Sequence, residues 1–278
     1  LLKRYVAIKS LKRDHLGNQE IIANFIAEAK VTAQLDHPSI IPLYEVNGDD
    51  EDRIHIAMKL IHGSTLDDVI EDTILDCKLM KDKRTADDEA ESLKSRLENF
   101  IKVCEAMHYA HKKNVIHRDL KPENIMIGQY HEVYVMDWGI AKVIPESGND
   151  EAPDPNGLCG TPGYIAPEVI EKQAYAPASD QYALGVILFE LSTLKHAMKG
   201  QTMTEVLQKT CAGKLETLEH YYPQYEIPDE IQAIIMKATA LNPADRYQSV
   251  DALADDIRRF LHGEETLALP DDQLRRLS

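Results

Sequence analysis

One stretch, residues 117–139, limits what this chain can fold into more than any other part of it. Two apolar runs, Ile125–Ile127 and Val133–Met136, flank a polar turn and predict a β-hairpin. The polar residues that this hairpin would bring toward one edge are Asp119, Asn124 and Asp137. Two carboxylates and an amide at a strand edge suit a hard cation such as Mg²⁺, which takes oxygen ligands and often shares them with substrate phosphates.

The same stretch carries a family resemblance. Residues 117–124 read His-Arg-Asp-Leu-Lys-Pro-Glu-Asn, which resembles the catalytic loop of protein kinases, with the family's spacing from Asp119 to Asn124. Asp137-Trp138-Gly139 resembles the Asp-Phe-Gly metal motif with Trp in place of Phe. Each motif alone could be a common tripeptide or a turn. A full match to the first motif, followed by the second at the distance of one hairpin, is very rare by chance. The resemblance implies the bilobal α+β kinase fold, with a small strand-rich N-lobe and a large, mainly helical C-lobe.

Charge and cysteine usage argue against several functions. The net charge of −16 disfavours nucleic acid or an anionic membrane as a default partner, because both need a basic face. The four cysteines form no C-x-x-C pair, which indicates reduced thiols in a cytoplasmic protein. Without a signal peptide or an apolar run near about 18 residues, we expect no membrane segment in this chain. A membrane anchor elsewhere in a parent protein, and the oligomeric state, stay open.

The first part of the chain is similar to a kinase N-lobe. Tyr5–Lys9 predicts a strand that resembles Val-Ala-Ile-Lys, whose lysine grips the α- and β-phosphates of ATP. An apolar stripe predicts a helix over Asn18–Leu35, on which Glu28 matches the glutamate that pairs with this lysine. Taken alone, Lys9 would be a solvated residue of an edge strand and Glu28 a surface acid.

Two further predicted strands, 40–46 and 54–58, lead into the expected hinge at residues 59–63. The residues that the resemblance places around adenine are Ala7 and Met126 on its two faces, Met58 at the back of the pocket, and backbone groups around Lys59 and Ile61. Helices are predicted over 67–74, 93–113, 179–191 and 249–261. The alternating charges of 78–91 predict a solvated loop or helix without chemistry.

Residues 140–168 resemble the activation segment, which closes with Gly160–Glu168. Arg118 stands where many kinases bind a phosphorylated residue of this segment. Between Gly139 and Gly160 the only hydroxyl side chain is that of Ser147. One hypothesis is that an acid of this loop occupies Arg118 instead, and an equal alternative is a solvated, disordered loop. The acids concerned are Glu146, Asp150, Glu151 and Asp154.

The resemblance also implies roles for the remaining site residues. Asp119 would accept or orient the substrate hydroxyl proton, Lys121 would steady the γ-phosphate, and Asn124 with Asp137 would hold Mg²⁺ or Mn²⁺. The residues with implied regulatory or structural roles are Arg118, Thr161, Glu168, Asp180 and Arg246. Among them, Asp180 would brace the catalytic-loop backbone and Arg246 would pair with Glu168. Lys121 and Thr161 are typical of serine/threonine-specific members.

We therefore expect a serine/threonine protein kinase domain of the eukaryotic-like type found in bacteria, which uses ATP and acts on a protein. We expect a partial N-lobe at 1–62, a C-lobe at 63–262 and a tail or linker at 263–278. No G-x-G-x-x-G loop precedes Tyr5–Lys9, so we expect an N-terminally truncated domain that binds ATP weakly and exposes a sheet edge there.

Two other functions stay open at this point. One is a pseudokinase-like binding or scaffold module, which the intact set of motif residues disfavours for the parent protein. The other is a small-molecule kinase of similar fold, against which Gly160–Glu168 and Arg246 favour a protein substrate.

Overall fold

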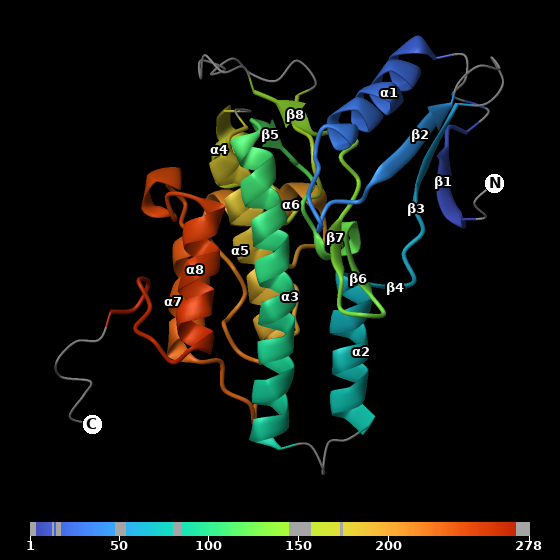
Figure 1. Ribbon diagram of the computed structural model, residues 1–278. Coiled ribbons are helices and arrows are strands. Elements are labelled where there is room, and N and C mark those ends of the chain that lie inside the picture. The colour runs from blue at the N-terminus through green and yellow to red at the C-terminus, as the bar shows by residue number, and fades with distance from the viewer. Residues whose placement is uncertain are drawn as a thin grey trace.

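The computed structural model describes residues 4–12, 14, 18–47, 54–79, 85–144, 157–172 and 175–270. A small part with a sheet and one helix lies beside a larger, mainly helical part (Figure 1). This arrangement confirms the predicted α+β kinase fold. The predictions for Ser147 and the four acids of the activation segment lie outside the described residues.

The small part is built on an antiparallel sheet of three strands. These are β1 (Val6–Ser10), β2 (Leu43–Asn47) and β3 (His55–Lys59), in the order β1-β3-β2. The register places Ala7 opposite Met58. Within the described residues β1 pairs on one side only, so the expected sheet edge is present. Tyr5, beside this edge, is 89% exposed.

Helix α1 (Gln19–Ala33) packs against this sheet and carries Glu28. The helix begins where it does because the Asn18 side chain accepts hydrogen bonds from the backbone N–H groups of residues 20 and 21. Phe25 and Ala29 face inward and form a small core with Ile56 of β3. The sheet and the helix thereby hold Lys9 and Glu28 on facing surfaces.

The predicted hairpin is present in the larger part, after α2 and α3 in the chain. It consists of β6 (Ile125–Gly128) and β7 (Val133–Val135), and β4 (Gly63–Thr65) pairs with the other edge of β6. Two short strands lie before and after the hairpin in the sequence, β5 (Val115–Ile116) and β8 (Lys142–Val143). They pair with each other. This pairing fixes both ends of the segment that contains the catalytic-loop and metal motifs.

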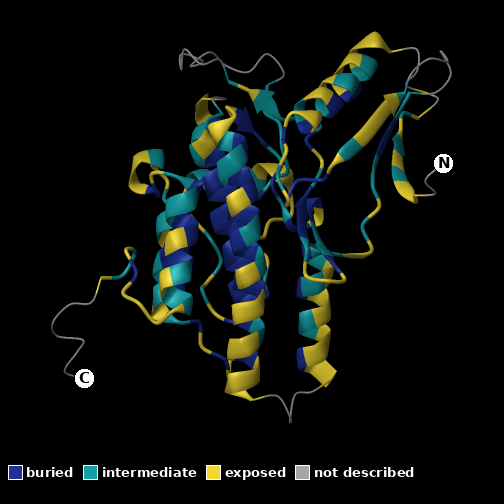
Figure 2. Cartoon of the chain, viewed as in Figure 1, coloured by how far each residue is buried: buried dark blue, intermediate teal, exposed yellow. Residues whose placement is uncertain are grey.

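Helices make up the rest of the larger part. They are α2 (Leu66–Leu79), α3 (Ala86–Lys112), α4 (Pro167–Lys172), α5 (Pro177–Thr193), α6 (Met203–Cys211), α7 (Asp229–Ala238) and α8 (Val250–Leu261), with 3₁₀ turns η2 (Pro122–Asn124) and η3 (Pro243–Asp245). Helix α5 is buried along its described length after its first turn, and α3 packs against both α5 and α8. The buried residues lie where these helices meet, while the far ends of α2 and α3 are largely exposed (Figure 2).

Two helices are longer than predicted. Helix α2 continues to Leu79, and α3 begins at Ala86 because Thr85 and Asp88 form a reciprocal capping box there. The prediction that 78–91 carries only solvated charge is wrong for Glu89, which is 6% exposed and pairs with Arg96. The alternating charges of 78–91 resemble those of a solvated segment, and they gave no sign of this buried ion pair.

Residues 263–270 pack against the helical part. Asp256 of α8 accepts hydrogen bonds from the backbone N–H groups of Leu267 and Ala268, at 2.5 and 2.9 Å. The side chain of Thr266 is buried. The described part of the expected tail is therefore attached to α8.

None of the helices in the described part of the chain is long and apolar enough to cross a bilayer.

Candidate active site

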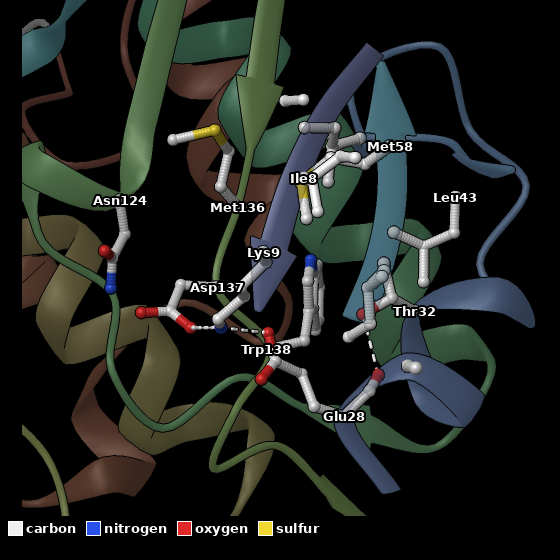
Figure 3. Close-up of a pocket in the computed structure, with 14 residues that line it drawn as sticks. Ile8, Lys9, Glu28, Thr32, Leu43, Met58, Asn124, Met136, Asp137 and Trp138 are labelled. Atoms are coloured by element: carbon white, nitrogen blue, oxygen red, sulfur yellow. Dashed lines mark hydrogen bonds and ion pairs between the residues drawn. The ribbon is translucent and has the colours of Figure 1, made fainter. Parts of the chain in front are cut away.

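A lysine with two acidic partners forms the first half of the site. Lys9 Nζ lies 2.5 Å from Glu28 Oε1 and 3.1 Å from Asp137 Oδ1 (Figure 3). These side chains come from β1, from α1 and from the turn after β7. The lysine thus joins the two parts of the fold through one ammonium group.

Burial and pairing act in opposite directions on this pair. Burial lowers the pKa of Lys9, but the hydrogen bond to Glu28 and the charges of Glu28 and Asp137 outweigh it, so the pKa is raised above its ordinary value. The pKa of Glu28 is raised above its ordinary value, because burial and the nearby charge of Asp137 together outweigh the hydrogen bond and charge of Lys9, which lower it. Lys9 therefore stays an ammonium ion.

The catalytic-loop motif forms the second half. Asp119 Oδ1 accepts a hydrogen bond of 2.6 Å from the Thr161 hydroxyl, and Lys121 Nζ donates to the same hydroxyl at 2.9 Å. Lys121 Nζ also lies 3.6 Å from Asp119 Oδ2. A carboxylate and an ammonium group that share one hydroxyl can bind, and deprotonate, an alcohol.

Asn124 and Asp137 could hold a divalent cation. The amide nitrogen of Asn124 donates to the backbone carbonyl of Asp119 at 2.8 Å, so its amide oxygen is the atom left to coordinate. Both side chains line one cavity and face the same space (Figure 3). Among the described residues no group of three His, Cys, Asp or Glu side chains is arranged around a metal. One carboxylate and one amide fit Mg²⁺, which takes its remaining ligands from phosphates and water.

A buried acid holds the backbone of the catalytic loop. Asp180 of α5, 2% exposed, accepts hydrogen bonds from the N–H groups of His117 and Arg118, both at 2.9 Å. Its carboxylate also bonds to the His111 ring at 2.8 Å. Burial raises the pKa of Asp180, but these partners outweigh it and hold the pKa below its ordinary range. They support Arg118 at φ +73°, a backbone conformation that is costly for a residue with a side chain.

Arg118 of the catalytic loop contacts Tyr175, which in turn binds the activation segment. Its guanidinium lies over the Tyr175 ring, 4.3 Å from the centroid. The hydroxyl of Tyr175 accepts from the Cys159 N–H at 2.7 Å and donates to the Cys159 carbonyl at 2.6 Å. An aromatic side chain therefore connects the arginine of the catalytic loop to the segment just before Gly160.

The segment ends at a buried ion pair. Arg246 donates two hydrogen bonds to the Glu168 carboxylate, at 2.9 and 2.7 Å, and others to the carbonyls of Ala178 and Ala240. The Arg246 side chain is fully buried. This pair attaches the start of α4 to the loop that contains η3.

A cavity of about 390 Å³ opens between the two parts. Of the residues expected around adenine, Ala7 and Met58 line it together with Lys9 and Glu28. Met126 lies on β6 opposite Tyr134, outside this lining. The backbone N–H of Lys59 is committed to the carbonyl of Pro42 at 3.1 Å, and Ile61 follows β3 without lining the cavity.

Sequence reasoning gave no site role to three residues that the structure places here. His117, within the recognised motif, is buried and packs its ring on Trp138 at 4.6 Å between centroids. Thr32 lines the cavity one helical turn after Glu28, a spacing that could have revealed it. Tyr175 has no local signal, because its partners are remote in sequence.

Comparison with known proteins identifies relatives of the chain. Residues 2–257 match the protein kinase domain family. The chain is 37% identical over 275 residues to the serine/threonine-protein kinase PknD of Protochlamydia amoebophila, with 94% of the chain and 28% of that protein covered. It is 33% identical to PknD of Chlamydia caviae, with 94% and 29% covered, and 34% identical to PknD of Chlamydia trachomatis serovar L2b, again with 94% and 29% covered. The chain thus spans less than a third of the length of these relatives.

Proposed function

Because the chain belongs to the protein kinase domain family, we propose that it transfers the γ-phosphate of ATP to serine and threonine hydroxyls of a protein. The observation that supports the proposal is two sets of paired charged side chains linked by Asn124, which lines the cavity and donates hydrogen bonds to Asp119. Lys9 bridges Glu28 and Asp137 on one side, while Asp119 and Lys121 hold a hydroxyl on the other. The names of the relatives support serine and threonine as acceptors.

We assign the reacting groups as follows. Asp119 orients the acceptor hydroxyl and takes its proton, and Lys121 stabilises the negative charge on the phosphoryl group during its transfer. Lys9 binds the α- and β-phosphates and is held in place by Glu28. Asn124 and Asp137 would hold Mg²⁺ or Mn²⁺, which would neutralise the phosphate charge. Phosphoryl transfer of this kind depends mainly on positioning and electrostatics, which suits preformed hydrogen bonds.

Adenine binding is assigned to the cavity between the two parts. Ala7 would cover one face of the base and Met58 would close the back of the pocket. Met126 lies on β6 outside the lining of the cavity, and would have to reach the other face of the base from there. Backbone groups around Lys59 would bond to its edge, and since the Lys59 N–H is already used, the carbonyl is the candidate there. The N–H of Ile61 would be the matching donor.

We further propose the lobe boundaries 1–62 and 63–262, with 263–278 as a tail. The passage from the first sheet to β4 at Gly63 supports the first boundary. We also propose that the chain acts on a protein substrate, uses ATP with a divalent metal ion, and is located in the cytoplasm. The closing segment, which Arg246 and Glu168 hold in place, supports a protein rather than a small molecule as acceptor.

The test is transfer of phosphate from Mg-ATP to a generic serine- and threonine-containing protein by the full-length protein. Asp119→Asn removes the base and should abolish transfer, whereas Asp72→Asn, the same change at an exposed position of α2, should leave it intact. Autophosphorylation of the full-length protein supports the proposal further. A folded, nucleotide-binding protein that transfers no phosphate would favour a scaffold role, and transfer to an aminoglycoside or choline alone would favour a small-molecule kinase.

A further inference from the structure

Another cavity lies in the helical part, between the last turn of α3, the start of α5 and the loop before α8. These helices are neighbours in the fold, because α3 packs against both α5 and α8 (Figure 1). The volume of this cavity is about 210 Å³, below the roughly 300–1,000 Å³ usual for drug-sized ligands. It shares no lining residue with the cavity of the active site. A ligand here would therefore be small and would not compete with ATP.

The residues that line this cavity favour an anion. The chain has a net charge of −16, yet among the described residues the lining contains no acid and includes His108, His111 and Lys112. Helices α5 and α8 both begin at the cavity, and the first N–H groups of a helix have no partner within it and attract negative charge. Ser249 Oγ accepts from the Ala252 N–H at 3.1 Å, which leaves its hydroxyl hydrogen to donate to a ligand.

One buried acceptor in this cavity has no partner. Gln181 lines the cavity and is 2% exposed, and within the described residues its amide oxygen Oε1 accepts no hydrogen bond. An amide oxygen can only accept, and a buried polar atom that stays unpaired destabilises the structure. The ligand that suits this cavity therefore carries negative charge for the cationic groups and one donor hydrogen for Gln181.

We propose that this cavity binds one free hydrogen phosphate ion. Its P–OH group donates to Gln181 Oε1, while its other oxygens accept from Lys112, Ser249 and the two helix N-termini. Free phosphate keeps at least one O–H at neutral pH, and sulfate keeps none. A phosphomonoester has mostly lost its own O–H there, because its second pKa is about 6. Gln181 thereby selects free phosphate over both.

The bound ion would lie one side chain away from the support of the catalytic loop. His111 lines the cavity and bonds to the Asp180 carboxylate at 2.8 Å. The same carboxylate accepts from the backbone N–H groups of His117 and Arg118. Three partners of its own thus stabilise the charge of Asp180 behind the cavity, and none of the groups assigned to phosphate transfer takes part in the site.

The test measures binding of ³²P-labelled inorganic phosphate to the full-length protein by equilibrium dialysis at neutral pH, with Mg-ADP present to occupy the nucleotide site. Unlabelled phosphate should displace the label. Sulfate, an ion of the same shape, should need a concentration about tenfold higher, because it leaves the buried Gln181 acceptor unpaired. Phosphoserine should compete as weakly as sulfate.

Three variants locate the site. Gln181→Met keeps the shape of the side chain and removes the acceptor, so phosphate and sulfate should then bind equally. Lys112→Gln should weaken both ions several-fold and leave their ratio unchanged. Lys113→Gln, the same change at an exposed lysine outside the lining, should weaken neither ion.

Equal competition by sulfate in the unmodified protein would overturn the proposal, even if no variant folds. The absence of saturable binding at millimolar phosphate would overturn it as well. So would full competition by phosphoserine, which would point to a phosphorylated segment as the ligand, or binding that Lys112→Gln leaves intact, which would place the phosphate elsewhere.

Discussion

Replacing Glu89 with Gln tests whether the buried ion pair at the start of α3 stabilises the fold. Glu89 Oε1 lies 2.6 Å from Arg96 Nη2 and 3.4 Å from His220 Nε2. All three side chains are at most 8% exposed. Because Arg96 also donates to the backbone carbonyl of Leu191, the pair connects α3 to the end of α5.

The expected loss of stability follows from the pKa of Glu89. Burial raises this pKa, but the closeness of His220 and Arg96 outweighs it and lowers the pKa from 4.5 to about 2. A difference of about 2.5 pKa units corresponds to about 3 kcal/mol of folding free energy near neutral pH. Since the folded-state pKa is depressed, this contribution is complete above pH 4.5 and is lost as the pH falls toward about 2.

The assay is urea unfolding, followed by the fluorescence of Trp138 and by circular dichroism at pH 7 and at pH 4. Glu89→Gln should lose about 3 kcal/mol at pH 7, and the gap to the unmodified protein should be about 1 kcal/mol smaller at pH 4. Glu91→Gln, on the exposed face of the same helix, should change little. A Glu89→Gln protein as stable as Glu91→Gln, or a gap that does not depend on pH, would refute the reasoning.

Three further predictions concern the activation segment. Glu168→Gln should cost about 3 kcal/mol in thermal or urea unfolding, because it leaves a fully buried guanidinium without its counter-charge; a loss below about 1 kcal/mol would contradict this. Gly160→Ala should reduce phosphate transfer and cost about 1–3 kcal/mol, since Gly160 has φ +109° and an added Cβ would lie 2.7 Å from the Arg118 carbonyl; unchanged kinetics and melting temperature would count against it. Tyr175→Phe should raise the KM for a protein substrate several-fold and leave that for ATP unchanged, because it removes both hydrogen bonds to Cys159 but keeps the ring under Arg118; equal changes in both constants would argue against a role in positioning.

Much of the fold was predictable because its signals are local. An apolar stripe at helical spacing predicted α1, in a range that began at Asn18. The hairpin of β6 and β7 followed from two apolar runs around a polar turn. The expected family is confirmed by the match over residues 2–257.

What the sequence did not reveal depends on contacts between distant residues. Charges that alternate along 78–91 resemble a solvated surface, and only the fold shows that Glu89 meets His220. The start of α3 had a local signal, the capping box of Thr85 and Asp88, that the prediction did not use. The contact of Arg118 with Tyr175 has no such signal, because Tyr175 lies in no motif and reaches Arg118 from the connection between α4 and α5.

The most direct test of phosphate transfer follows the phosphoryl group itself. The full-length protein is incubated with Mg²⁺, a generic protein substrate and ATP labelled with ¹⁸O in its γ-phosphoryl group, and the products are analysed by mass spectrometry. We predict labelled phosphate on serine and threonine side chains, and none when Asp137→Asn removes the carboxylate that Lys9 contacts. Nucleotide binding without labelled serine or threonine, in a protein that is folded, would contradict the assignment of this site.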